Sequence, residues 1–142
     1  MNTTVHLRRL LPAPREEVFR AWTDPERLRQ WFTPMVGSSA GAEIDPRVGG
    51  RFRFGMKLGP LVRHFSGTYL EVEPPERLVF TWEGDWRAID VGETLVTVEF
   101  HDRGGKTELV LTHERQPSRR AKAFHSFGWH DTLRKLERLI RT

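Results

Sequence analysis

Between residues 18 and 32, apolar side chains recur at helical spacing in two short runs that flank a Thr-Asp-Pro break. Side chains three and four residues apart share one face of a helix, so each run predicts a short helix with a bulky aromatic edge. Thr23 is predicted to cap the second helix, Glu26 to complete a capping box, and Pro25 to prevent one continuous helix. Helices this short are unstable alone in water, so both are expected to lie on a larger apolar surface.

The pattern then changes to alternation, which is typical of half-buried antiparallel strands. In residues 51–57 Phe and Met alternate with Arg and Lys. Residues 64–86 predict two further strands joined by a Pro-Pro-Glu-Arg turn, and residues 93–114 predict a hairpin over a Gly-Gly turn. Residues 3–11 predict a first strand ahead of the two short helices.

A long helix is predicted to close the chain, from about Ser118 to Arg141. Its apolar ladder consists of Trp129, Leu133, Leu136 and Ile140. Strands gathered in one run with segregated helices indicate the α+β class. We therefore expect a curved antiparallel sheet of about six or seven strands wrapped around the C-terminal helix, with the two short helices covering its open end.

Composition narrows the class of protein. The 142 residues suit one domain, predicted to span residues 1–142. Lys and Arg number 23 and Asp and Glu 19, but the two signs are interleaved, so nucleic-acid binding is not predicted. No cysteine is present, which excludes disulfides and thiolate metal sites. No signal peptide or membrane-spanning stretch is recognised, so we predict a cytoplasmic location and no membrane insertion.

Five ordered blocks carry a family likeness: "VFRAWTDPERLRQWF", "DPRVGGRFRFGM", "GTYLEVEPPERLVFTW", "LVLTHE" and "GWHDTLRKLERL". The chain resembles the family of the activator of the 90-kDa heat-shock protein ATPase, within the SRPBCC superfamily of START, polyketide-cyclase and birch-pollen-allergen-like domains. The resemblance implies a helix-grip fold that encloses an apolar cavity. The eukaryotic activators carry a separate N-terminal domain before this one, whereas this chain begins at the first strand. We therefore expect ligand binding rather than co-chaperone activity.

Strand alternation indicates which side chains face the interior, although a single bulge reverses the assignment. Counting back in steps of two from Val72 and Leu70, taken as inward-facing, predicts that His64 faces inward. Tyr69, the only tyrosine, is then predicted on the outer face. The residues predicted to line a ligand cavity are Trp31, Phe52, Phe54, Met56, His64, Phe80, Trp82, Trp86, Phe100, His113, Phe124 and Gly128.

Several of these residues allow two interpretations. His113 is interpreted either as a hydrogen-bonding group or general base for a ligand, or as a core histidine tied to backbone or to the helix. Trp82 and Trp86 either stack on a flat ligand or fill the concavity of the sheet. Gly128 disfavours a helix, so it indicates either close approach to the sheet or room for a ligand beside Trp129.

No metal site is predicted, because the six histidines lack ligand spacing, and no cofactor or nucleophile–base pair is recognised. The favoured function is binding of a hydrophobic or amphipathic small molecule in a central cavity. The two short helices are predicted to gate its entrance, with Thr23-Asp24-Pro25 as their hinge. The alternatives are a stress-related protein that binds a chaperone partner and a small cyclase-type enzyme. A homodimer is kept as a further hypothesis.

Overall fold

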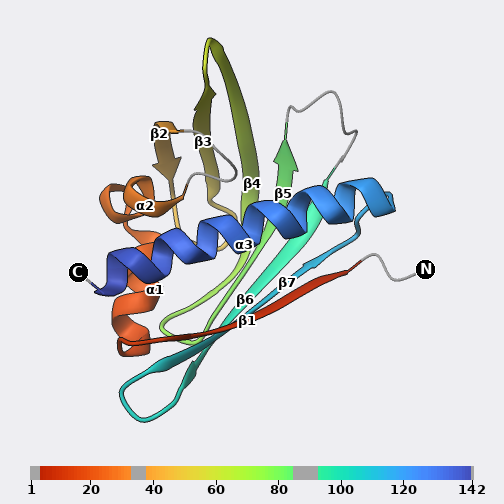
Figure 1. Cartoon of the computed structure of the whole chain (residues 1–142). Coiled ribbons are helices and arrows are strands. Elements are labelled where there is room, and N and C mark those ends of the chain that lie inside the picture. Colours follow the sequence, from red (N-terminus) through yellow and green to blue (C-terminus); the bar gives the residue numbers. More distant parts are fainter. Residues whose placement is uncertain (1–3, 33–37, 85–92, 142) are drawn as a thin grey trace.

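The computed structural model describes residues 4–32, 38–84 and 93–141. Its strands form one antiparallel sheet in the order β1-β7-β6-β5-β4-β3-β2 (Figure 1). The strands are β1 (Val5–Leu11), β2 (Ser38–Ile44), β3 (Arg51–Leu58), β4 (Leu61–Glu73), β5 (Arg77–Gly84), β6 (Thr94–Asp102) and β7 (Thr107–Glu114). Each strand from β2 to β7 pairs with the next along the chain, and β1 closes the row beside β7.

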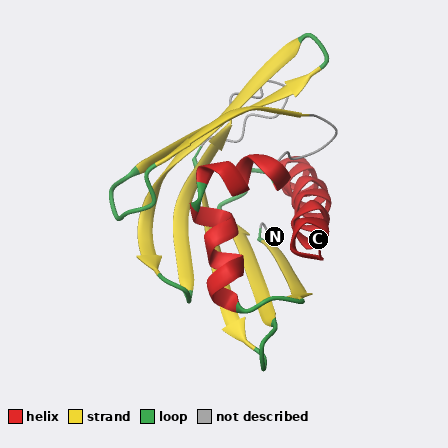
Figure 2. Cartoon of the chain, turned by 90° about the vertical axis from the view of Figure 1, so that its left-hand side faces the viewer, coloured by secondary structure: helices red, strands yellow, loops and turns green. Residues whose placement is uncertain are grey.

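In the described part of the chain, three helices lie on the concave face of this sheet. They are α1 (Arg15–Thr23), α2 (Pro25–Trp31) and α3 (Arg119–Arg141). The sheet curves around α3, and α1 and α2 stand beside that helix within the same concavity (Figure 2). The α+β class, the two short helices after the first strand and the long C-terminal helix are therefore confirmed. None of the helices in the described part of the chain is long and apolar enough to cross a membrane.

The junction between α1 and α2 is capped differently from the prediction. The Asp24 side chain accepts a hydrogen bond from the backbone N–H of Glu26 at 3.0 Å, so Asp24 and not Thr23 is the N-cap of α2. The Thr23 hydroxyl donates instead to the carbonyl of Phe19, one turn earlier in α1, at 3.0 Å. A hydroxyl bonded back into its own helix is not available to cap the next one. Pro25 occupies the first turn of α2, as predicted.

Alternation correctly predicts the inner face of most strands. In β3 the buried side chains are Phe52, Phe54 and Met56, and in β6 they include Val96, Val98 and Phe100. Val98 lies opposite Leu111 of β7, another fully buried residue. Strands β6 and β7 pair without a bulge, so their side chains alternate between the two faces of the sheet along the whole pairing.

Strand β4 contradicts the prediction, because its pairing with β5 shifts register between Tyr69 and Glu71. The extra residue reverses the alternation: Leu70 is 45% exposed, whereas Tyr69 is only 4% exposed and belongs to the core. The same reversal buries Phe65 and leaves His64 half-exposed on the opposite phase. The inward prediction for His64 and the outward prediction for Tyr69 were both wrong, and the bulge is the physical reason.

The core between sheet and helices is rich in aromatic rings. Trp22 of α1 stacks on Trp129 of α3 with ring centroids 6.1 Å apart and an interplanar angle of 27°. Trp31 meets Trp22 edge-on at 4.8 Å. Along α3 the predicted ladder is buried at Trp129, Leu133 and Leu136 and half-buried at Ile140. Aromatic packing therefore holds α1 and α2 in place, which is needed because helices this short are unstable alone in water.

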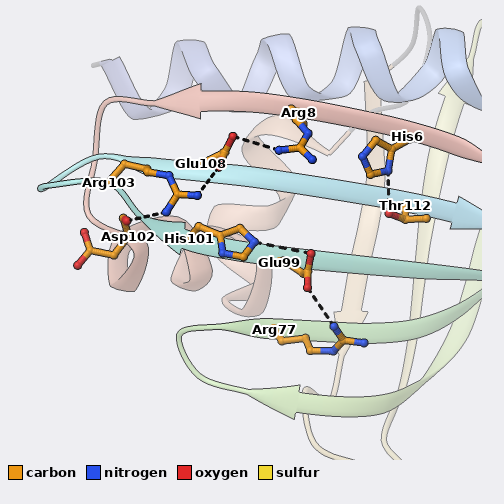
Figure 3. A network of polar contacts seen from close by, with 9 residues as sticks. All are labelled: His6, Arg8, Arg77, Glu99, His101, Asp102, Arg103, Glu108 and Thr112. Carbon is orange, nitrogen blue, oxygen red and sulfur yellow. Dashed lines mark hydrogen bonds and ion pairs between the residues drawn. The ribbon is translucent and has the colours of Figure 1, made fainter.

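The outer face of the sheet is polar. Figure 3 shows side chains of β1, β7, β6 and β5 joined across neighbouring strands. Arg103 donates to Glu108 at 2.6 Å, and Arg77 donates to Glu99 at 3.2 Å. The large exposed apolar side chains of the described residues are Leu10, Val48, Leu61, Val62, Leu70 and Phe127.

Candidate functional site

Two small apolar pockets lie inside the concavity of the sheet, each with a volume of about 20 Å³. We name them after the helix that contributes to each. The α2 pocket is lined by Trp22, Leu28, Phe32, Ile44, Phe52, Phe54, Tyr69, Leu78, Phe80 and Trp82. The α3 pocket is lined by Phe32, Phe65, Trp82, Phe124, His125, Gly128, Trp129 and Thr132. A volume of this size holds about one water molecule.

Phe32 and Trp82 line both pockets and therefore form the partition between them. Phe32 follows α2 as its C-cap residue, and Trp82 comes from β5. The Phe32 ring lies 5.8 Å from Trp82, 4.4 Å from Phe54 and 5.6 Å from Trp129, measured between centroids.

Three residues of the pocket walls carry buried polar atoms that have no hydrogen-bond partner among the described residues. These atoms are the indole nitrogens of Trp22 and Trp82 and the hydroxyl oxygen of Thr132. By contrast, the Trp31 indole donates to the carbonyl of Ala21 at 3.0 Å. Buried polar groups are nearly always paired, so unpaired groups gathered on two adjoining pockets require an explanation.

Beside the α3 pocket, a chain of hydrogen bonds fixes the tautomer of His113. The Trp129 indole donates to His113 Nδ1 at 3.0 Å, so the proton of the neutral ring is on Nε2. Nε2 lies 2.6 Å from the Thr94 hydroxyl, which itself donates to the carbonyl of Trp82 at 2.8 Å. His113 is thus a buried core histidine tied to the helix, one of the two interpretations from the sequence.

His125 is the second buried imidazole at this position, with its ring centroid 4.4 Å from that of His113. Its Nδ1 lies 2.7 Å from the side-chain oxygen of Gln116. Burial lowers the pKa of His125 to about 4, against the opposing effect of a hydrogen bond to the backbone of Ala121. Burial, followed by the neighbouring His125, holds the pKa of His113 well below 6.5. Both rings are therefore neutral at physiological pH.

Tyr69 adds a neutral hydroxyl to the wall of the α2 pocket. Burial raises the pKa of this phenol, and the carboxylate of Asp45 raises it further. Among the described residues no group of three or more His, Cys, Asp or Glu side chains is placed to hold a metal ion. Taken together, the two pockets present aromatic surface and a few neutral polar groups.

The structure divides the predicted site residues into four groups. Those that line a pocket are Phe52, Phe54, Phe80, Trp82, Phe124 and Gly128. Those that are buried but line neither pocket are Trp31, Met56, Phe100 and His113. His64 borders a surface groove beside Arg53 instead. Trp86 lies outside the described residues.

Sequence reasoning missed several wall residues, among them Trp22, Phe32, Tyr69, His125 and Thr132. A signal was present for Thr132, which follows Gly128 and Trp129 at helical spacing and so shares their face of α3. Trp22 and Phe32 were the aromatic ends of the two short apolar runs, which were expected only to pack on a larger apolar surface. Tyr69 was lost to the bulge in β4.

Comparison with known families decides the classification. The model of the family described as "Activator of Hsp90 ATPase homolog 1-like protein" matches residues 12–141. The chain belongs to this family. A search of the curated proteins found no match to this chain.

Solved structures support the assignment of this family member. A protein from Chromobacterium violaceum is 27% identical, with a TM-score of 0.86 over 100% of this chain and 99% of that one. A protein of the same family from Aeromonas hydrophila is 28% identical, with a TM-score of 0.83 over 97% and 92% of the two chains. DynU16, from the dynemicin biosynthetic locus, is 27% identical, with a TM-score of 0.77 over 100% of this chain and 48% of that one.

Proposed function

We propose that this protein binds a hydrophobic or amphipathic small molecule in its interior, between the sheet and α3, with the cytoplasm as the predicted location. One observation carries the proposal: the unpartnered atoms of Trp22, Trp82 and Thr132 all belong to residues that line the two adjoining apolar pockets. Ligand sites are typically apolar cavities with a small number of polar groups that fix orientation. The pockets have this composition.

The energetics favour a ligand over a permanently closed core. A buried donor or acceptor left unpaired costs about 1–3 kcal/mol, so a ligand that pairs these atoms recovers that energy. Apolar surface of the ligand adds about 25 cal/mol per Å² removed from water. Against this, small-molecule sites usually enclose about 300–1,000 Å³, whereas each pocket has about 20 Å³. Binding must therefore enlarge the interior as a whole, and we infer that the enlargement includes separation of Phe32 from Trp82.

The similarity to DynU16 is consistent with this proposal, because that protein is associated with a biosynthetic locus for a small molecule. A cyclase-type activity would rest on the same interior. For a chaperone partner, an exposed and contiguous apolar patch would be the favourable sign. The large exposed apolar side chains of the described residues are Leu10 of β1, Val48 before β3, Leu61, Val62 and Leu70 of β4, and Phe127 of α3. We place ligand binding first because the unpartnered polar atoms belong to residues that line the pockets.

Native mass spectrometry of protein purified gently from its own source tests the proposal. We expect a mass above that of the chain, lost on denaturation and recovered as a discrete small molecule. The same preparation, stripped by unfolding and refolding, should take up the extracted molecule again at one equivalent. A mass equal to that of the bare chain across growth conditions, together with no uptake of the extract, would contradict the proposed function.

A further inference from the structure

The geometry points to the chemical class of the ligand: we propose that the α3 pocket binds a neutral carbonyl oxygen, which accepts hydrogen bonds from the Trp82 indole and the Thr132 hydroxyl. This inference rests on the proposed function, because it assigns one end of the same interior site. The remainder of the molecule would be an apolar ring system extending past Phe32 into the α2 pocket.

The two donors are the starting point. Trp82 is 2% exposed and Thr132 is fully buried, and neither the indole nitrogen nor the hydroxyl has a partner among the described residues. An indole N–H can only donate, so Trp82 requires an acceptor. The hydroxyl of Thr132 can donate as well. Both side chains line the same small pocket. In the proposed complex one ligand oxygen, with its two lone pairs, accepts from both.

The other polar side chains of the α3 pocket, Trp129 and His125, each have a hydrogen-bond partner at one ring nitrogen. The Trp129 indole donates to His113, which places that N–H outside the reach of a ligand. The His125 ring is engaged through Nδ1 by Gln116. A ligand oxygen that enters this pocket therefore meets two unsatisfied groups, both capable of donating, on Trp82 and Thr132. This arrangement selects an acceptor rather than a donor on the ligand.

The pocket also selects a neutral oxygen over a carboxylate. Among the described residues its walls contain no lysine or arginine, and the one ionisable side chain in that part of the wall, His125, is uncharged at neutral pH. Burial of an anion without a counter-charge is far more costly than burial of a hydrogen-bonded carbonyl. A ketone, quinone or similar carbonyl compound therefore fits, whereas a fatty-acid carboxylate does not.

The apolar end follows from the α2 pocket. Phe52, Phe54 and Phe80 supply flat faces on the sheet side, while Leu28 closes the pocket from α2. Aromatic faces at ring-stacking distances favour a rigid ring over a flexible chain. The predicted ligand class is thus a fused-ring ketone, with its oxygen beneath α3 and its rings between the sheet and α2.

Four probes of one skeleton test the inference: 1-tetralone, 1-tetralol, tetralin and 1-tetralincarboxylate. Dissociation constants are measured by calorimetry on the full chain. The quantity of interest is the ratio of the tetralin constant to the tetralone constant, because the shared skeleton cancels the apolar contribution. In Thr132→Val we expect this ratio to fall by about 3- to 10-fold, the amount that one hydrogen bond contributes. The carboxylate should bind most weakly of the four.

Thr107→Val is the matched control, since Thr107 is another fully buried threonine but its hydroxyl donates to Ala13 and it lines neither pocket. The ratio should be unchanged in this variant. A second readout is the ¹H–¹⁵N signal of the Trp82 indole, assigned by its loss in Trp82→Phe. We expect it to move downfield with tetralone and not with tetralin.

The outcomes separate the two proposals. Equal binding of tetralin and tetralone, or an unchanged ratio in Thr132→Val, would overturn the carbonyl inference while the binding function stands. Tightest binding of the carboxylate would overturn it also. If no probe bound either the wild type or Phe32→Ala, the variant that lacks the phenylalanine between the two pockets, the result would contradict the proposed function itself.

Discussion

Two buried threonines with opposite surroundings show what a single hydroxyl contributes. Thr94 and Thr132 are both fully buried. The Thr94 hydroxyl donates to the Trp82 carbonyl and lies 2.6 Å from His113 Nε2, whereas that of Thr132 has no partner among the described residues. Removal of one partner of a buried hydrogen bond lowers the free energy of unfolding far more than replacement of both partners by apolar groups. The two positions should therefore respond in opposite ways to the same substitution.

We predict that Thr94→Val lowers the free energy of unfolding by about 1–3 kcal/mol, because it leaves the Trp82 carbonyl and the His113 N–H unpaired. Thr132→Val should leave that free energy unchanged or raise it by up to about 1 kcal/mol, because it replaces an unsatisfied hydroxyl with a methyl group. Urea denaturation of both variants measures the difference. A loss in Thr132→Val as large as that in Thr94→Val would show that the Thr132 hydroxyl is paired.

The neighbouring histidines predict an acid-sensitive fold. His113 and His125 have folded-state pKa values below the ordinary 6.5, and that of His125 is about 4. Below pH 6.5 the unfolded chain therefore binds more protons than the folded one, and stability falls as the pH falls. The expected loss between about pH 6.5 and 4 is up to about 1.4 kcal/mol per pH unit for each histidine. Protonated His113 would also lose its capacity to accept from Trp129.

Urea midpoints measured across this pH range check the prediction. In His125→Gln the slope of stability against pH should be reduced by about half. His101→Gln is the control, since His101 lies on the polar outer face of the sheet. A slope that is the same in wild type and in His125→Gln would mean that His125 does not titrate on unfolding.

At the scale of elements, α3 contains a glycine in its buried face. Gly128 lies beside Trp129 and lines the α3 pocket, in a helix that runs for 23 residues. A glycine inside a helix costs about 1 kcal/mol relative to alanine. The structure places this residue at a pocket wall.

We predict that Gly128→Ala raises the free energy of unfolding by about 1 kcal/mol. The same change should weaken probe binding several-fold, because the new methyl group occupies part of the α3 pocket. Denaturation and calorimetry measure the two effects. Ala123→Gly, at an exposed position of the same helix, should cost a similar energy and leave binding unchanged. A destabilised Gly128→Ala would favour close contact with the sheet as the reason for the glycine.

The junction of α1 and α2 was predicted to act as a hinge for a gate. The Trp31 indole donates to the Ala21 carbonyl across this junction, and its ring packs edge-on against Trp22. These contacts bind the two helices to each other, so we expect α1 and α2 to move together rather than to fold about residues 23–25. The gate stays a prediction, with Phe32 as its inner face.

Elements were predictable wherever the period was unbroken. Phe52, Phe54 and Met56 were assigned to the interior correctly, because β3 is regular over these residues. Tyr69 and His64 were not, because a bulge in β4 is determined by pairing with β5 and not by local composition. The cap of α2 failed for a related reason: Thr23 and Asp24 are both good caps, and only the end point of α1 decides between them.

At the scale of the whole molecule, the partition by Phe32 governs whether the interior is a core or a cavity. We predict that Phe32→Ala joins the two pockets and lowers the free energy of unfolding by about 3–5 kcal/mol. Tetralin should bind this variant more tightly than the wild type and should restore part of the lost stability, since ligand binding favours the folded state.

Denaturation with and without tetralin measures both effects. Phe127→Ala is the control, because Phe127 is 59% exposed on α3. It should change neither stability nor binding appreciably. If tetralin stabilised the wild type and Phe32→Ala equally, the phenylalanine would not be the partition that a ligand displaces.

The pocket walls were only partly predictable from the sequence. Alternation found the walls that strands supply, such as Phe80 and Trp82. It could not find the space between them, because that space depends on how Trp22 and Phe32 pack against strands that are distant from them in sequence. A pocket volume is the small difference between two large volumes, that of the space enclosed by the backbone and that of the side chains that fill it.

The aromatic cluster has one further consequence, which is optical. Trp22 and Trp129 are stacked, and Trp82 lies 5.4 Å from Trp129, so three indoles of the pocket walls share one chiral arrangement. Indoles held this close couple their electronic transitions, and the coupling depends steeply on the angle between rings. The near-ultraviolet circular dichroism of the unmodified protein should therefore change when any molecule separates Phe32 from Trp82. The interior carries its own spectroscopic reporter, and compound libraries can be screened without a label.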